Sequence, residues 1–370
     1  MLFRSWILAV FLLTFSISHS AHAYPPGGTI EEDSERNVRS FLNTNLTLGG
    51  FFASSLTGEK QENQNLHSAS SVNTFGLNLG AEFSDSLAFN SQIINYMTLP
   101  PQNPENDPQY QGFFPAHNQP QSFQLATAVT QAYVEWSASD NFAVDFGLGY
   151  APFGIALQLF EPVLFVRRGG PQFLTNNVLV VPTWDGLRAH GQFPVSSTAF
   201  HYDVYTFSSN FNPNSLGMGE RLWWRSEDDK FRYGISNLTG KRGFTTFDSV
   251  GMDLRVISGN LTLTAEAVKS LGEGAQPWSF YVEPDYSTAR DTLILFVFGD
   301  YLLDPLASIA PTSQVISGPY QKWEYGAGAN WLPNVFTRFR LSFTLNDYIG
   351  SSAAVHPNYE SLDLSVGVSF

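Results

Sequence analysis

The chain ends in the twelve-residue stretch Y-E-S-L-D-L-S-V-G-V-S-F, from Tyr359 to Phe370, in which apolar and polar residues alternate. Successive side chains of a β-strand point to opposite faces, so this stretch would form a strand with one apolar and one polar face. The apolar face would carry Leu362, Leu364, Val366, Val368 and Phe370, and the polar face Ser361, Asp363, Ser365, Gly367 and Ser369. Any half-buried strand alternates in this way, so the rest of the chain must show which kind of sheet it closes.

The N-terminus has the pattern of a secretory signal. Arg4 precedes an apolar run at 6–17, and the small-residue ending Ala21-His22-Ala23 follows. This order of charged, apolar and cleavage regions predicts a signal peptide at 1–23 and Sec-type export. The apolar run is short for a spanning helix, and no later stretch reaches 18 apolar residues without interruption. The chain has no cysteine, so no disulfide can stabilise the exported protein.

The composition favours a membrane barrel. Aromatic residues make up 15% of the chain and charged residues only 14%, whereas charged residues average about a quarter of a soluble protein. A barrel whose outer face meets lipid accounts for both values. The net charge of −14 argues against a nucleic-acid partner, which would require a basic surface. We therefore expect an all-β transmembrane antiparallel barrel in the bacterial outer membrane, in contact with its lipid.

The spacing of the alternating segments predicts the strand number. Segments of about ten residues recur from Asn45 onward, joined by connections that are alternately short and long, as in barrels with short periplasmic turns and long external loops. Short turns are predicted at 84–85, 137–141, 194–198, 227–230, 258–260, 288–291 and 332–334. Long connections are predicted at 55–70, 99–122, 151–183, 210–219, 240–247, 271–276, 303–321 and 347–358. This count implies about sixteen strands, with 14 or 18 as alternatives.

The chain before the first strand is predicted to be a periplasmic tail. Residues 24–43 are rich in Pro and Gly and then acidic, and a short helix is expected near 35–42. Such a segment is too short to fold as a plug domain, although it could lie along the inner wall. The predicted domains are therefore the signal peptide, this tail and a barrel at 44–370.

The long connection at 151–183 is the most informative segment for function. A loop of this length is usually functional, and its apolar residues should pack against something. The stretch at 293–298, L-I-L-F-V-F, is apolar on both faces, so its inward face could receive the loop. We expect the loop to be tucked into the barrel, with Glu161, Arg167 and Arg168 at a pore constriction. The alternative is that both arginines are ordinary surface charges.

The polar faces of the strands predict a hydrated lumen. The candidate wall residues are Glu135, Asp145, Arg188, Asp253, Arg255, Arg338 and Arg340. Charges of both signs would be heavily penalised in a dry core, and about sixteen strands enclose more volume than side chains fill. Arg338 and Arg340 lie on the same face, where they would either attract anions or pair with wall carboxylates.

Aromatic residues at the predicted strand ends share the parity of the apolar faces. The candidates for an aromatic girdle are Phe83, Trp136, Phe142, Tyr150, Trp323, Trp331 and Phe370. A soluble β-sandwich with aromatic strands is the alternative, but it would leave the signal peptide and the asymmetry of the connections unexplained.

Several stretches resemble a known family. A-Y-V-E-W from Ala132, F-A-V-D-F-G-L-G-Y-A-P-F-G from Phe142, W-S-F-Y-V-E-P-D-Y from Trp278 and Y-G-A-G-A-N-W-L-P-N from Tyr325 are similar to segments of the phosphate-selective porin O and P family. The resemblance implies a sixteen-stranded, trimeric channel for small hydrophilic solutes. By the count of hairpins, 151–183 is the third external loop, which folds into the barrel and narrows the channel in many porins. The resemblance also identifies Phe370 as the signal read by the barrel-assembly machinery. Phosphate selectivity does not follow, because that family has a lysine-rich lumen and lysine is scarce here.

The sequence thus predicts a porin-like channel for passive diffusion of small hydrophilic solutes or ions, without a cofactor. A hydrophobic-substrate channel is one alternative, motivated by the aromatic content and the apolar stretch at 293–298. An outer-membrane barrel enzyme is the other, but no H-E-x-x-H or G-x-S-x-G motif is present. The mature histidines are scattered along the chain, so no metal site and no catalytic residue is predicted.

Overall fold

A computed structural model gives the fold of the chain. It describes residues 46–61, 68–84, 86–99, 124–139, 141–155, 171–175, 179–181, 183–195, 198–209, 212–242, 245–271, 276–288, 292–304, 320–349 and 358–370. The predicted signal peptide and tail lie outside the described residues. No helix among the described residues is long and apolar enough to cross a membrane.

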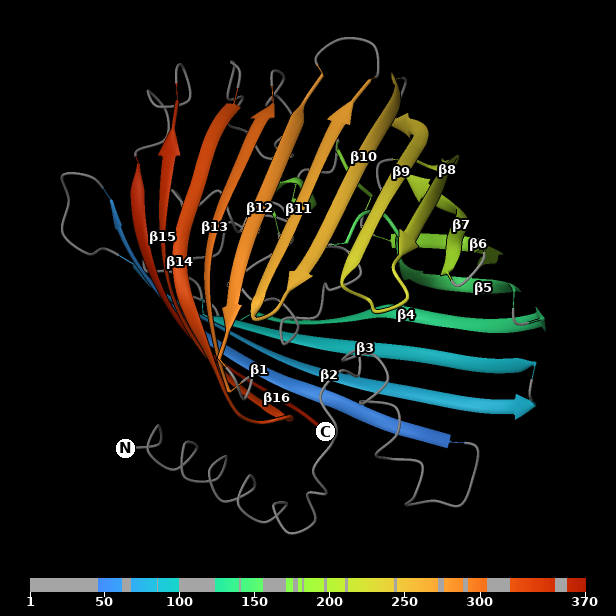
Figure 1. Cartoon of the computed structure of the whole chain (residues 1–370), viewed down its shortest axis with the longest axis horizontal. Coiled ribbons are helices and arrows are strands. Elements are labelled where there is room, and N and C mark those ends of the chain that lie inside the picture. Colours follow the sequence, from blue (N-terminus) through green and yellow to red (C-terminus); the bar gives the residue numbers. More distant parts are fainter. Residues whose placement is uncertain are drawn as a thin grey trace.

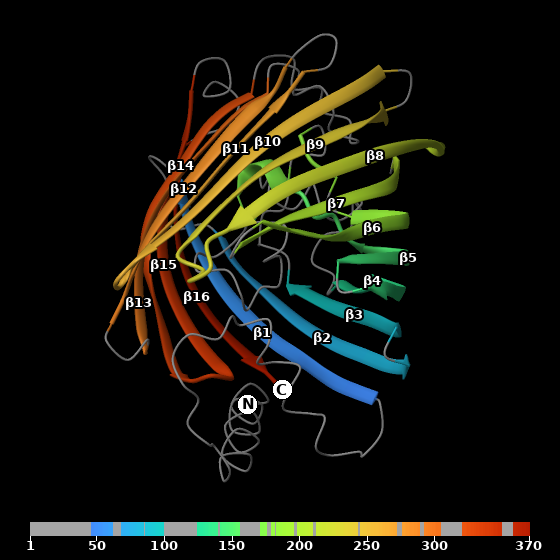
Figure 2. The same ribbon diagram turned by 45° about the vertical axis from the view of Figure 1, so that its right-hand side comes forward.

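Sixteen antiparallel strands wind in sequence order around a closed barrel (Figures 1 and 2). They are β1 Leu46–Gln61, β2 Ser68–Ser84, β3 Leu87–Leu99, β4 Gln124–Ser139, β5 Phe142–Tyr150, β6 Thr183–Val195, β7 Thr198–Ser209, β8 Asn212–Arg225, β9 Phe231–Arg242, β10 Thr245–Ser258, β11 Leu261–Ser270, β12 Trp278–Ser287, β13 Leu293–Asp304, β14 Tyr320–Asn334, β15 Thr337–Tyr348 and β16 Tyr359–Ser369. A single 3₁₀ turn, η4 at Gln172–Thr175, is also described. The predicted barrel and its sixteen strands are confirmed.

Alternation along the strands separates an apolar outer face from a polar inner face. In β16, Leu362 and Leu364 are each 55% exposed, whereas Asp363 between them is 1% exposed. β15 repeats this pattern, because Leu341 is exposed and the adjacent Arg340 is buried. In a closed barrel the exposed apolar side chains must point outward, because the polar side chains of the opposite parity point into the enclosed space.

The barrel closes where the last strand meets the first. β16 pairs antiparallel with β1 from Phe51 opposite Ser369 to Gln61 opposite Tyr359. Two backbone hydrogen bonds complete the ladder beyond the last strand residue, from the Gly50 N–H to the Phe370 carbonyl (2.8 Å) and from the Phe370 N–H to the Gly50 carbonyl (2.9 Å). The predicted pairing of the C-terminal strand with the first strand is confirmed, and it leaves neither strand with an open edge.

Three predicted long connections are wrong in extent. β1 continues to Gln61 into the connection predicted at 55–70, and β8 begins at Asn212 inside the one predicted at 210–219. The connection predicted at 240–247 is mostly strand, because Gly240 pairs with Phe247 and Arg242 with Thr245. Ladder hydrogen bonds are made by the backbone, so a strand continues after its apolar alternation has ended. The sequence pattern records only the part of each strand that carries apolar residues.

The last short turn also lies later than predicted. β14 runs through the predicted turn at 332–334 to Asn334, and the turn falls at Val335 and Phe336. The pairing of β14 with β15 shifts register between Trp331 and Asn334. This irregularity lets the strand extend past Pro333, which lacks the N–H needed for a regular ladder.

Candidate functional site on the inner wall

The connection after β5 turns into the barrel at its first residues. Ala151 and Phe153 are completely buried, and Ile155 is buried beside them. The glycine between Phe153 and Ile155 has a φ of +66°, a conformation that side chains with a Cβ adopt only at a cost. A Cβ on Gly154 would also clash with Oε1 of Glu266 on β11. Gly154 therefore allows the chain to pass against the far wall.

Two strands of that wall hold the backbone of Gly154. Its N–H donates to Oγ of Ser236 on β9 (3.1 Å), and its carbonyl accepts from Nη1 of Arg221 on β8 (2.5 Å). Phe153 fits next to Gly251 on β10, where a Cβ would come within 2.7 Å of the ring. The start of the third loop is thus fastened across the interior, from β5 to β8–β11.

The arginine that holds the loop is itself held by an ion pair. Nη2 of Arg221 lies 2.9 Å from Oδ2 of Asp253 on β10, and both side chains are completely buried. A buried charge is stable only when it is paired and hydrogen bonded. Asp253 supplies the opposite charge, and the Gly154 carbonyl takes a further N–H of the guanidinium. The Arg221–Asp253 pair therefore joins two wall strands and also holds the start of the loop.

An apolar cluster joins the rest of the described loop to the inner wall. On the loop side it contains Ala151, Phe153, Phe173, Leu174, Leu179, Val180 and Val181. On the wall side it contains Trp184, Tyr205, Phe207, Leu238, Val268, Tyr281, Phe296, Phe298 and Leu302. Phe296 and Phe298 belong to the stretch at 293–298 that is apolar on both faces. Packing against the loop explains why the inward face of this stretch is apolar. Leu295 and Val297 lie on the opposite face and are exposed.

A second attachment lies at η4. The backbone N–H of Gln172 donates to Oδ2 of Asp300 on β13 (2.7 Å). The Gln172 side-chain amide donates to the Asp300 carbonyl (3.3 Å). Both residues are buried, so the two hydrogen bonds satisfy polar groups that water does not reach. The loop is therefore fastened near both of its ends.

The residues predicted at the constriction itself, Glu161, Arg167 and Arg168, lie outside the described residues. Their place in a constriction stays a prediction. The described parts of the loop on either side of them are buried at 151–155 and at 171–174.

The predicted wall residues occupy neighbouring strands. Arg188 on β6 contacts Oδ2 of Asp145 on β5 (3.3 Å) and, more closely, Oδ1 of Asp203 on β7 (2.6 Å). Glu135 on β4 lies opposite Asp145 in the ladder. The structure thus brings Glu135, Asp145 and Arg188 together on one part of the wall, whereas Asp253 belongs to the loop attachment.

The remaining predicted arginines lie further around the ring. Arg340 is buried and donates from Nε to Oδ1 of Asn330 on β14 (2.9 Å). Arg338, two residues earlier on the same face, is also buried. Arg255 on β10 lies opposite Arg232 in the ladder. The structure therefore separates the predicted wall charges into different sectors, and their part in selecting ions stays a prediction.

Most predicted girdle aromatics lie on the outer face at the ends with short turns. Phe83, Trp136, Phe142, Trp331 and Phe370 are all exposed. Trp323, near the ends with long connections, packs on Tyr301 with ring centroids 4.8 Å apart. Tyr150 differs, because its hydroxyl donates to Oε1 of the buried Gln92 (3.0 Å). Contact of these rings with lipid headgroups stays a prediction.

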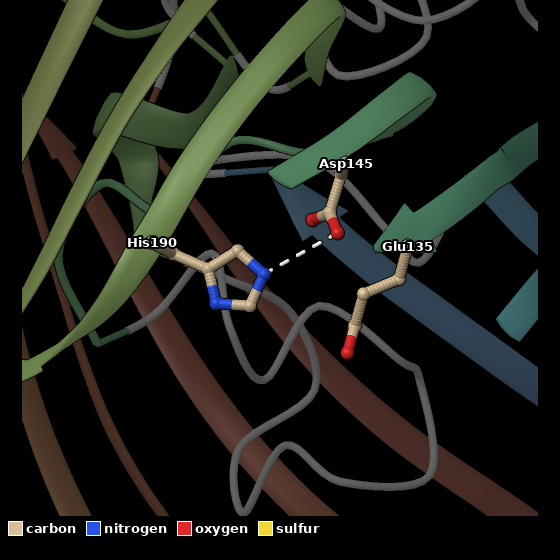
Figure 3. Close-up of side chains that lie close together, drawn as sticks. All are labelled: Glu135, Asp145 and His190. Atoms are coloured by element: carbon tan, nitrogen blue, oxygen red, sulfur yellow. Dashed lines mark hydrogen bonds and ion pairs between the residues drawn. The ribbon is translucent and has the colours of Figure 1, made fainter. Parts of the chain in front are cut away.

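Sequence reasoning missed the contacts that fasten the loop. Gln172 and Asp300 are 128 positions apart, and only the strand register brings Arg221 beside Asp253. The one usable signal was Gly154 in the P-F-G stretch. Sequence reasoning also missed a cluster of three side chains on the wall, in which His190 on β6 lies close to the carboxylates of Asp145 and Glu135 (Figure 3).

Comparison with known proteins identifies the fold. No protein-family model matches the chain, and no curated protein matches it. The solved structure of Pseudomonas putida OprB at high pH is similar, with a TM-score of 0.62 at 9% identity, over 90% of this chain and 96% of that one. An anion-selective porin from Comamonas acidovorans gives a TM-score of 0.60 at 8% identity, over 88% and 100% of the two chains. The trimer form of OmpT, an outer membrane protein of Vibrio cholerae, gives a TM-score of 0.55 at 9% identity, over 88% of this chain and 99% of that one.

The chain therefore has the sixteen-stranded barrel fold of these outer-membrane proteins. The identities are too low to carry over what any of them transports. The similarity to the phosphate-selective porin O and P family remains a resemblance of short sequence segments.

Proposed function

We propose that this protein is an outer-membrane channel through which small hydrophilic solutes or ions diffuse passively. The observation that carries the proposal is a third loop fastened inside a closed sixteen-strand barrel, by Arg221 at its start and by Asp300 near its return. A barrel of this size encloses more space than its wall side chains fill. A loop held inside it narrows that space without removing it.

We further propose the surroundings of the barrel. Its exposed outer residues, such as Phe146 and Leu364, would contact outer-membrane lipid. Phe370, whose backbone completes the seam, would be read by the barrel-assembly machinery after Sec-type export. A homotrimer is proposed from the resemblance to the porin O and P family, and the similarity to a protein solved as a trimer supports it.

The proposed selectivity is weak. Arg188 contacts two carboxylates, Asp145 and Asp203, whereas Arg255 lies opposite Arg232, so the described wall carries charges of both signs. Rings of one charge near the narrowest point set ion preference. We therefore propose that preference depends on Glu161, Arg167 and Arg168 and that the channel has no phosphate selectivity.

The two alternatives gain no support from the described residues. The hydrophobic-substrate channel was motivated by the apolar stretch at 293–298, but Phe296 and Phe298 pack in the same cluster as Phe173 of the loop. They are covered and offer no open apolar path. No observation favours a barrel enzyme, and we propose that the protein is not one.

Planar-bilayer recording tests the proposal. The folded protein should insert as large, stable conductance steps, and a barrel that stays closed in repeated reconstitutions would overturn it. Reversal potentials in a salt gradient should then shift toward cations in Arg167→Ala and Arg168→Ala. Unchanged reversal potentials in both variants would assign these arginines to the surface and remove the constriction.

A further inference from the structure

Three potential metal ligands come together on the inner wall. Glu135 lies opposite Asp145 in the β4–β5 ladder, and His190 lies opposite Ala143 in the β5–β6 ladder. Side chains of one parity therefore converge from three neighbouring strands (Figure 3). One carboxylate oxygen of each acid and a ring nitrogen of His190 all lie within 4.8 Å of one another. The group is separate from the contacts that fasten the third loop.

The spacing of the His190 and Asp145 atoms fits one bound ion. Nε2 of His190 lies 3.3 Å from Oδ1 of Asp145. Two ligands that bind one zinc ion at about 2.0–2.1 Å and at a tetrahedral angle are about 3.3–3.4 Å apart. Glu135 lies within 4.8 Å of the other two ligand atoms, and its side chain, the longer of the two acidic side chains, would turn toward the ion on binding.

Neighbouring groups orient the carboxylates toward that point. Ser137 donates its hydroxyl to Oε1 of Glu135 (3.1 Å), which leaves the second oxygen for an ion. Nη1 of Arg188 donates to Oδ2 of Asp145 (3.3 Å), which leaves Oδ1 directed at His190. Metal ligands are typically fixed in this way by hydrogen bonds from a second layer of residues.

The charges of this sector also call for a cation. Glu135, Asp145 and Asp203 carry three negative charges, and Arg188 carries one positive charge. Arg188 lies nearest to Asp203, which it contacts through Nε (3.0 Å) and Nη2 (2.6 Å). Asp145 is completely buried, where an uncompensated carboxylate is costly. The three acids and Arg188 together have a net charge of −2, which one divalent cation would balance.

We propose that Glu135, Asp145 and His190 bind a transition-metal dication of the zinc type on the inner wall of the barrel. An imidazole with two carboxylates suits zinc and its neighbours, whereas Mg²⁺ and Ca²⁺ prefer oxygen ligands alone. Three protein ligands leave a fourth position open to water or solute. The side chains of His190 and Arg188 are each 23% exposed, so an ion can reach the group.

Isothermal titration calorimetry of the full, untagged chain folded in detergent tests the site with Zn²⁺, and Mg²⁺ serves as the comparison ion. Wild type should bind about one Zn²⁺ with saturation and bind Mg²⁺ far more weakly. Loss of a ligand should weaken Zn²⁺ binding by at least about tenfold, the lower end of what loss of a second-layer partner costs. His190→Ala and Glu135→Gln should each show this loss.

His201→Ala is the matched control. His201 lies on the inner face of the next strand, stacked on Trp223 at 3.8 Å, and is not part of the group. Its variant should bind Zn²⁺ as wild type does, and Co²⁺ bound to wild type should give a visible d–d band that His190→Ala loses. Absence of saturable Zn²⁺ binding, or equal binding by wild type and His190→Ala, would overturn the proposal. Equal loss in His201→Ala would also overturn it.

Each variant is scored only after heat-modifiable gel migration shows a folded barrel. None of these results depends on whether the barrel conducts.

Discussion

At the scale of single residues, the guanidinium of Arg221 connects the wall to the third loop. It pairs with Asp253 and donates to the Gly154 carbonyl, and none of its side chain is exposed. Neither contact is visible as a motif, because the partners lie on different strands and in a loop. The sequence predicted Asp253 on the wall but had no means of assigning it this partner, since strand register decides it.

Replacing Arg221 with leucine should destabilise the folded barrel strongly. Breaking a buried pair by removing one partner costs about 3–5 kcal/mol, since the other charge is left unpaired. Arg221→Leu should therefore lower the free energy of unfolding in urea by that amount. The double variant Arg221→Leu/Asp253→Leu should recover much of the loss, because it leaves no buried charge. A double variant no more stable than the single one would contradict this reading.

Gly154 gives a second prediction at this scale, with a matched control. Gly154→Ala should destabilise the fold by more than the roughly 1–2 kcal/mol that a left-handed backbone costs a residue with a Cβ, because its Cβ would also meet Glu266. Gly259 has a similar φ of +59° but nothing within 4 Å of a Cβ. Gly259→Ala should show the backbone cost alone in the same urea experiment. Equal losses in the two variants would show that the loop yields freely at Gly154.

At the scale of elements, β13 and η4 pack against each other. The inner face of β13 is apolar where the loop packs, and η4 packs against β12 and β13. The sequence predicted contact between the loop and β13 from two signals, the apolar residues of the loop and the two-sided apolar stretch at 293–298, and the cluster confirms it. It did not predict Gln172 and Asp300, because a polar contact between one glutamine and one aspartate leaves no periodic signal.

A disulfide should form between the loop and β13. The backbone N–H of Gln172 donates to the Asp300 carboxylate (2.7 Å), so the two residues are neighbours and a cysteine pair at 172 and 300 tests their contact. The chain has no native cysteine, so Gln172→Cys/Asp300→Cys should crosslink on mild oxidation, as read by mass spectrometry of a digest. The control pair, Gln172→Cys/Thr57→Cys, places the second cysteine on β1 and should not crosslink. A crosslink in the control alone would place η4 elsewhere in the barrel.

The turn between β8 and β9 gives a prediction about pH. Hydrogen bonds from the Lys230 ammonium and the Ser226 hydroxyl lower the pKa of Asp228 from its ordinary value of 3.8 to about 2. A lowered pKa stabilises the folded state above the ordinary value, and this stabilisation is lost as pH falls through about 2. The stability difference between wild type and Asp228→Asn should therefore be constant near neutral pH and shrink between pH 4 and 2. A difference that does not depend on pH would contradict the assignment.

At the scale of the whole molecule, the barrel was readable from the sequence because alternation and connection length are one-dimensional signals. The alternation in the closing strand, Tyr359–Ser369, indicated both its apolar outer face and its pairing with the first strand. The wall sites were not readable, because Glu135, Asp145 and His190 meet only through the registers of two ladders. Strand ends were misplaced wherever the ladder continues through polar residues, as it does at Arg242 and Thr245.

We propose that the third loop, held inside the barrel, narrows an open channel. Tyr150 and Thr183 are direct partners in the β5–β6 ladder, so a hairpin loop of about four residues can connect β5 to β6 in place of 151–182. Single-channel conductance of wild type and this shortened variant, at the same salt concentration, tests the claim most directly. We predict stable open channels from both, with a larger conductance for the shortened variant. Equal conductances, or barrels that stay closed in both cases, would contradict it.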